Sequence, residues 1–147
     1  MKLVLDASMA LAWFFERSDT AQADCAQSAL LAVGEADVYV PALWHIEIAN
    51  ALLVGERRGV VSTAQVLDYL SRLSRLPIIT DDTPSTSRRD LIMALAREHN
   101  LSAYDATYLD LALRSNATLA TFDKQLARAL NDAGGKLFEA YSQLEKC

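Results

Sequence analysis

Short strand-like segments alternate with longer helix-like segments along this chain, and that alternation constrains the fold more than any other feature. Continuous apolar runs bounded by turn residues are typical of strands covered on both faces, as in a parallel sheet. The strand candidates are residues 2–5, 37–40, 77–80 and 117–121, with a short edge strand at 137–138. We therefore predict an α/β domain with a mostly parallel sheet and right-handed crossovers.

The intervening segments carry the signals that begin and end helices. Ser62 with Gln65 three residues later forms a capping-box pattern, and Gly34 and Gly59 follow apolar helical segments. Residues 81–87 are polar, and we predict a loop there. The predicted helices are residues 7–15, 20–33, 42–58, 63–76, 88–100, 103–113 and 123–133.

Length and composition limit the class of protein. A chain of 147 residues, 52% hydrophobic, is large enough to bury a core, and we expect one domain over residues 1–147. The net charge of -5 argues against a general nucleic-acid-binding protein, which would be basic. We expect a cytoplasmic protein without membrane contact, because no apolar window reaches about 18 residues and Asp6 interrupts the apolar start. Cys25 and Cys147 lack metal-site spacing and are expected to be free thiols.

Two acidic residues directly follow strand candidates. Asp6 comes after residues 2–5, and Asp123 comes two residues after the strand that ends near Thr121. The carboxyl ends of parallel strands share one edge of a sheet, which is where sites lie in open α/β folds. The topology therefore brings Asp6 and Asp123 to the same rim if their strands are neighbours.

Two more acids stand on helix faces that are otherwise apolar. Glu47 shares a stripe with Asn50, three residues on, in a helix that has no clearly polar face before Glu56. Asp105 shares its stripe with apolar residues and has no cation at helical spacing. Asp110, by contrast, precedes Arg114 by four residues, which is the ordinary arrangement on a solvated helix face.

Each acid also has an ordinary explanation. Asp105 and Asp123 could be helix N-caps, and Glu47 could border solvent. Caps do not explain Glu47, and none of these explanations accounts for four acids without nearby cations. Four converging carboxylates cannot all stay ionised without a cation. Oxygen ligands favour Mg²⁺ or Mn²⁺, since no cluster of Cys or His is available for Zn²⁺. Such a site suits hydrolysis of a phosphodiester.

The motifs in this order resemble those of the PIN-domain ribonucleases, and within them the VapC-type toxins of toxin–antitoxin pairs. The resemblance covers essentially the whole chain and rests on Leu3-Val4-Leu5-Asp6-Ala7-Ser8, Pro41-Ala42-Leu43-Trp44, Glu47-Ile48-Ala49-Asn50-Ala51-Leu52, Tyr104-Asp105-Ala106-Thr107-Tyr108 and Thr121-Phe122-Asp123. It implies a three-layer α/β/α fold with a central, mostly parallel sheet of about five strands.

The resemblance also implies an activity and a set of partners. It implies a Mg²⁺-dependent endoribonuclease, with Mn²⁺ as the other suitable ion, that forms a homodimer and is inhibited by a VapB-type antitoxin lying in its groove. The implied residues are the catalytic acids Asp6, Glu47, Asp105 and Asp123, with Asp6, Asp105 and Asp123 holding the metal, and the supporting residues Ser8, Asn50 and Thr121.

An acidic protein that binds RNA needs a local basic surface. Lys124, directly after Asp123, is the best candidate by proximity. Other candidates are Arg57 with Arg58, Arg88 with Arg89, and Arg72 with Arg75. Each of these pairs is equally typical of a solvated helix face or of a helix C-terminus favoured by the dipole.

Three other classes of protein are compatible with parts of this pattern. A phosphatase with an aspartyl nucleophile usually has a second Asp where this chain has Ser8, and a receiver domain needs an acidic pair at the end of its first strand. A catalytically silent PIN-like binding module, whose acids hold a structural ion or a partner's arginine, is compatible with all of the acids. Metal-dependent cleavage that an Asp6→Asn variant lacks would distinguish the enzyme from the binding module.

Overall fold

A five-stranded parallel sheet forms the centre of the computed structural model, which describes residues 1–140. The strand order is β3-β2-β1-β4-β5, and every neighbouring pair is parallel. The strands are β1 (Lys2–Leu5), β2 (Asp37–Val40), β3 (Ile78–Thr80), β4 (Thr118–Ala120) and β5 (Lys136–Leu137). The predicted mostly parallel α/β sheet is therefore confirmed.

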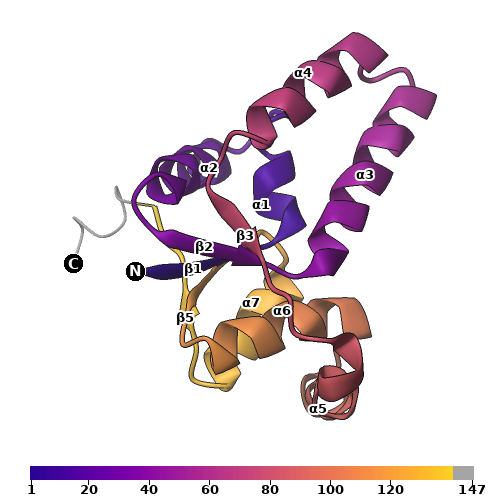
Figure 1. Cartoon of the computed structure of the whole chain (residues 1–147). Helices are drawn as coiled ribbons and strands as arrows, with labels where there is room; N and C mark the ends of the chain where they lie inside the picture. The colour runs from indigo at the N-terminus through magenta and orange to yellow at the C-terminus, as the bar shows by residue number, and fades with distance from the viewer. Residues whose placement is uncertain (141–147) are drawn as a thin grey trace.

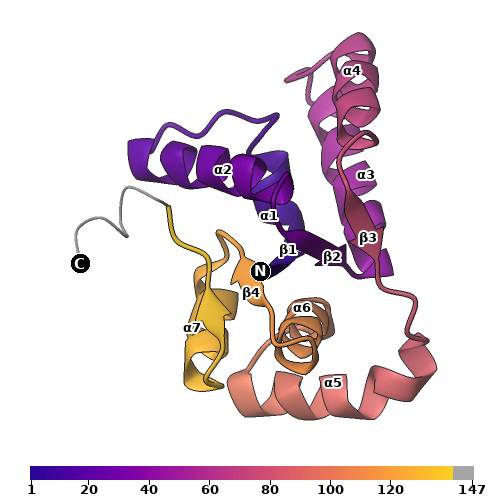
Figure 2. The ribbon, with the colours of Figure 1, turned by 60° about the vertical axis from the view of Figure 1, so that its left-hand side comes forward.

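Helices cover both faces of this sheet, as the three-layer prediction required. Figures 1 and 2 show α1 to α4 on one side of the sheet and α5 to α7 on the other, with α3 and α4 extending away from it as an arm. The helices are α1 (Ala7–Leu11), α2 (Thr20–Val33), α3 (Ala42–Arg57), α4 (Thr63–Leu73), α5 (Ser85–His99), α6 (Ala103–Arg114) and α7 (Lys124–Asp132).

The core lies on both faces of the central strand. Leu3, Val4 and Leu5 of β1 have no exposed surface, because helices pack on both of its faces. Leu109 of α6 and Leu126 of α7 are likewise fully buried in the same cluster. Continuous apolar runs in the sequence thus identified a strand that is buried on both sides.

Several predicted boundaries are wrong, among them the end of α4, which lies at Leu73 and not at residue 76. Helix α5 begins at Ser85, inside the predicted loop, because Pro84 has the extended backbone of an N-cap residue and polar residues occupy the first turn. Helix α1 ends at Leu11, and residues 12–15 form turns. Strand β5 pairs at Lys136–Leu137, one residue earlier than predicted. Apolar content alone does not set the limits of such short elements.

The predictions about membrane contact and about the two cysteines are tested only in part by the structure. None of the helices between residues 1 and 140 combines the length and the apolar character needed to cross a bilayer. Cys25 carries a free thiol within the described residues, whereas Cys147 lies outside them.

Candidate active site

Asp6 lies where the two central strands end. Its backbone N–H donates to the carbonyl of Ala120 at 3.0 Å, which ties the end of β1 to the end of β4. Asp6 is also the N-cap residue of α1, but its side chain makes no capping bond. Its buried carboxylate instead accepts the hydroxyls of Ser8 at 2.7 Å and Thr121 at 2.6 Å, both on Oδ2. Both hydroxyls thus bind the same oxygen of the Asp6 carboxylate.

The same two hydroxyls hold the chain that carries Asp123. Ser8 Oγ accepts the N–H of Phe122, and Thr121 Oγ1 accepts the N–H of Asp123, each at 3.0 Å. Ser8 and Thr121 thus connect two segments that lie more than a hundred residues apart in the sequence. The structure places both of them directly on Asp6, the position that the resemblance implies.

The side chain of Asp123 caps a helix, whereas that of Asp105 does not. Asp123 is the N-cap of α7, because its Oδ1 accepts the N–H of Leu126 at 2.9 Å, so the capping explanation holds for this residue. Asp105 is not a cap. The N-cap of α6 is Ser102, whose hydroxyl accepts the N–H of Asp105 at 3.1 Å. The carboxylate of Asp105 lies in the first turn of α6 without a capping role.

Glu47 is held by a residue that the sequence did not single out. The hydroxyl of Tyr108, a fully buried side chain of α6, donates to Oε1 of Glu47 at 2.6 Å. The available signal was the position of Tyr108 on the same inward stripe as Asp105, three residues on. Asn50 is exposed, and its side chain makes no hydrogen bond to the described residues.

The pKa values of Asp6, Glu47 and Asp105 are raised by burial and by neighbouring acids. Burial is the main cause that raises the pKa of Asp6, and the charge of Asp123 adds to it. Burial also raises the pKa of Glu47, with further increases from Asp6 and Asp105 and an opposing effect of the Tyr108 hydroxyl. Burial raises the pKa of Asp105, and the charges of Asp123 and Asp6 raise it further. Asp6 is therefore within electrostatic reach of the other three acids.

The donor set fits a hard divalent cation. The carboxylates of the four acids supply oxygen ligands, as Mg²⁺ and Mn²⁺ prefer. Among residues 1–140, no group of three or more Asp, Glu, His or Cys side chains is placed to hold a metal ion by itself. This arrangement suits Mg²⁺, which takes one or two direct carboxylates and keeps several water ligands.

The basic candidates lie at different distances from the acids. Lys124 is exposed at the first residue of α7, next to Asp123. Arg57 ends α3 ten residues after Glu47, which is roughly 15 Å along a helix. Arg17, which the sequence did not single out, places its guanidinium 4.3 Å from the centre of the Phe122 ring, beside Asp123.

Arg88 is engaged in an ion pair. Its guanidinium binds both carboxylate oxygens of Asp110, at 3.0 and 2.6 Å, and Asp110 is only 5% exposed. The expected pairing of Asp110 with Arg114 is present, but the expectation of a solvated helix face is wrong, since Asp110 is buried. Arg114 lies 3.4 Å from Asp110 and also pairs with Asp81 after β3, so one ionic network joins three elements.

Comparisons with known proteins agree with this geometry. The PIN domain family profile matches residues 3–130. Ribonuclease VapC3 of Pyrobaculum aerophilum is 32% identical over 130 residues, which is 86% of this chain and 93% of the relative. Ribonuclease VapC3 of Mycobacterium tuberculosis (strain CDC 1551 / Oshkosh) is 30% identical over 128 residues, 87% of each chain.

Two crystal structures share the fold. PAE2754 from Pyrobaculum aerophilum has a TM-score of 0.65 and 25% identity, covering 88% of this chain and 79% of that chain. FitAcB from Neisseria gonorrhoeae has a TM-score of 0.63 and 17% identity, covering 95% of this chain and 98% of that chain. The family profile, the relatives and the fold agree, and this chain therefore belongs to the PIN domain family, as a member of the VapC type.

Proposed function

We propose that this protein is an endoribonuclease that hydrolyses RNA phosphodiester bonds with Mg²⁺, or Mn²⁺, as its cofactor. One observation carries the proposal: Asp6 follows β1 and Asp123 follows the neighbouring strand β4, and the charges of Asp6, Asp105 and Asp123 act on the acids around them. Burial and repulsion between acids raise the pKa of Asp6, Glu47 and Asp105. The two relatives named Ribonuclease VapC3 support the reaction class.

The acids divide into two roles under this proposal. Asp6, Asp105 and Asp123 would hold the ion, directly or through its water ligands. When bound, Mg²⁺ would neutralise the phosphate oxygens, lower the pKa of an attacking water and stabilise the leaving 3′ oxygen. Glu47, whose Oε1 is occupied by the Tyr108 hydroxyl, would orient a water molecule with its other oxygen. No side chain is needed as a nucleophile.

The hydroxyl groups around Asp6 favour its ionised form. Ser8 and Thr121 both donate to Oδ2, and hydrogen bonds to a carboxylate lower its pKa, which opposes the effect of burial. Asp6 is thereby kept available as a ligand. Because both hydroxyls bind Oδ2, Oδ1 would be the oxygen that contacts the ion or its water.

We also propose the biological setting of the enzyme. The VapC type supports a toxin of a toxin–antitoxin pair, with RNA as substrate and a VapB-type antitoxin as partner. We propose a homodimer of one-domain chains spanning residues 1–147, acting in the cytoplasm. Lys124 is the basic residue best placed to contact RNA beside Asp123, and Arg57 and Arg88 remain secondary candidates.

Cleavage assays with matched Asp→Asn variants test the proposal. Wild type, Asp6→Asn and Asp68→Asn are incubated with cellular RNA in Mg²⁺ or EDTA, and the new 5′ ends are mapped. Asp68 forms an exposed pair with Arg72 on α4 and serves as the control. We expect wild type and Asp68→Asn to cleave only with Mg²⁺, and Asp6→Asn not to cleave.

Two results would contradict the proposal. Cleavage that persists in EDTA or in Asp6→Asn would remove the metal-bound carboxylates from the reaction. A protein that binds RNA but never cleaves it would be a silent binding module. In cells, expression without a partner should arrest growth for wild type and Asp68→Asn, but not for Asp6→Asn.

A further inference from the structure

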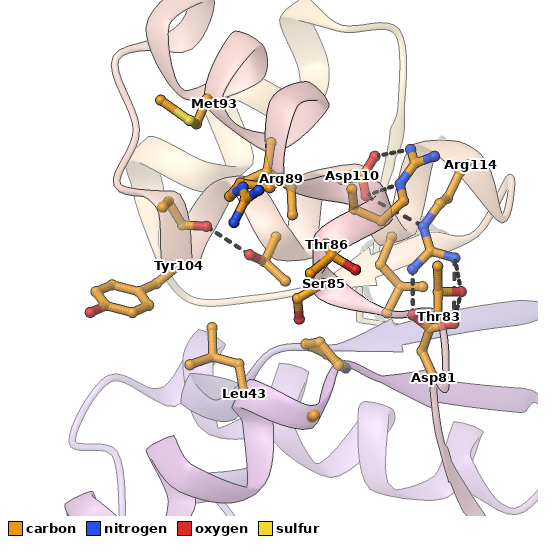
Figure 3. Close-up of a pocket in the computed structure, with 17 residues that line it drawn as sticks. Leu43, Asp81, Thr83, Ser85, Thr86, Arg89, Met93, Tyr104, Asp110 and Arg114 are labelled. Carbon is orange, nitrogen blue, oxygen red and sulfur yellow. Dashed lines mark hydrogen bonds and ion pairs between the residues drawn. The ribbon is translucent and has the colours of Figure 1, made fainter.

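A cavity of about 360 Å³ lies between the N-terminal end of α3, the segment after β3, the first half of α5 and the length of α6 (Figure 3). Leu43 and Tyr104 line it. Leu43 precedes Glu47 by one helical turn, and Tyr104 precedes Tyr108 by one turn. The Tyr108–Glu47 hydrogen bond therefore lies one turn further along both helices. Tyr104 also directly precedes Asp105, so one edge of the cavity lies next to an acid of the candidate site.

The walls of this cavity combine three kinds of group. Ile92 and Met93 of α5 supply apolar surface, and Ser85 and Thr86 supply hydroxyls from the first turn of the same helix. Arg89 also lines the cavity, and it is exposed and takes part in none of the ion pairs formed by the described residues. A concave site with apolar walls and a few polar groups is typical of small-ligand binding.

The far end of the cavity is formed by the ionic network. Arg88 pairs with Asp110, and Arg114 pairs with Asp81. These bonds connect the segment after β3 with α5 and α6, so they hold two walls together. The charges of these two arginines and two aspartates cancel. Arg89 adds one positive charge, so the lining of the cavity is positive although the chain has a net charge of -5.

We propose that this cavity binds one nucleobase of single-stranded RNA, next to the phosphodiester that the acids would cleave. This inference rests on the proposed function. Tyr104 is 64% exposed and directly precedes Asp105, so its ring can stack on a base. The hydroxyls of Ser85 and Thr86 match the donors and acceptors of a base edge. Arg89 complements a flanking phosphate, which favours RNA over an apolar protein segment as the occupant.

RNA binding without cleavage tests the subsite. In an Asp6→Asn background, a short fluorescein-labelled single-stranded RNA of mixed sequence is titrated with protein in Mg²⁺ buffer, and its anisotropy is measured. Adding Tyr104→Ala should weaken binding about tenfold, since stacking on one base has that order of magnitude. Tyr104→Phe keeps the ring and should bind within about twofold of the parent. Arg89→Gln should lower the salt dependence by about one counterion.

Leu67→Ala on α4 is the matched control, since Leu67 is 63% exposed and lies outside the cavity. Equal binding by the parent and Tyr104→Ala would overturn the subsite, and the cavity would then be open to a protein partner. Equal losses in Tyr104→Ala and Leu67→Ala, or no RNA binding at all, would also overturn it. If wild type cleaves nothing but the Tyr104→Ala loss persists, the proposed function fails and the subsite stands.

Discussion

Replacing Tyr108 with phenylalanine removes a single hydroxyl from a fully buried side chain, and with it the 2.6 Å hydrogen bond to Glu47. No carbon atom is lost, so the packing of α6 against the sheet is unchanged. The hydroxyl lowers the pKa of Glu47, whereas burial and the charges of Asp6 and Asp105 raise it. We therefore expect Tyr108→Phe to raise the pKa of Glu47 further and to free its side chain to rotate.

The magnitude follows from the type of bond. A hydrogen bond to a charged group contributes about 1.5–3 kcal/mol, and each 1.36 kcal/mol corresponds to a factor of about ten in rate. If Glu47 must be ionised and oriented in the transition state, kcat/KM should fall about tenfold to a hundredfold. The acidic limb of the pH–rate profile should move to higher pH, because a larger fraction of Glu47 is protonated at any given pH.

Tyr69→Phe is a matched control for this experiment. Tyr69 is also buried, and its hydroxyl donates to the backbone carbonyl of Ala10 at 2.7 Å, away from the acids. Its loss should cost about 1 kcal/mol, or about 3–4 °C in Tm for a chain of this length. It should leave the pH profile in place. The reasoning is refuted if Tyr108→Phe cleaves RNA with the wild-type pH profile, or if Tyr69→Phe shifts that profile equally.

Two further perturbations test the electrostatics of the structure. The folded-state pKa values of Asp6, Glu47 and Asp105 are raised, so their contribution to stability is present below the ordinary carboxyl pKa and is lost as pH rises through the raised values. In EDTA, Asp105→Asn should therefore raise Tm at neutral pH and have less effect at acidic pH. Adding Mg²⁺ should raise the Tm of wild type more than that of the variant. Equal melting curves of wild type and Asp105→Asn under these conditions would contradict this. Asp110→Asn breaks a buried ion pair and should lower Tm more than Asp68→Asn, which breaks an exposed one, as calorimetry would show.

The fold could be predicted from the sequence because the apolar residues of most segments are the ones that are buried in the folded chain. Strand β1 is a continuous apolar run in the sequence and is buried on both faces. Helix α2 ends directly before Gly34, as its alanine-rich sequence and this glycine predict. The start of helix α5 was predicted at residue 88 and lies at Ser85. No residue of this helix is buried, so its first turn shows no apolar periodicity that could mark the start.

The site was predictable only in part. The meeting of Asp6 and Asp123 follows from a parallel sheet, and Asp105 follows from its helix stripe. The bond between Tyr108 and Glu47 joins residues 61 positions apart, and no local spacing encodes it. The burial of Asp110 depends on Arg88, 22 positions earlier and on another helix. Helical spacing pointed instead to Arg114, which is the weaker of the two contacts.

The strand order also determines when the nuclease centre can assemble during translation. Asp6 leaves the ribosome well before Thr121, which donates to it and lies 115 residues later, and β4, one of the two strands that pair with β1, is equally distant. Pairing over such separations forms late, because a long loop must close first. A growing chain that already carries Asp6 and Glu47 therefore still lacks Asp123 and the pairing of β1 with β4. For the proposed ribonuclease, a nascent chain cannot cleave RNA with its full set of acids before Asp123 has left the ribosome.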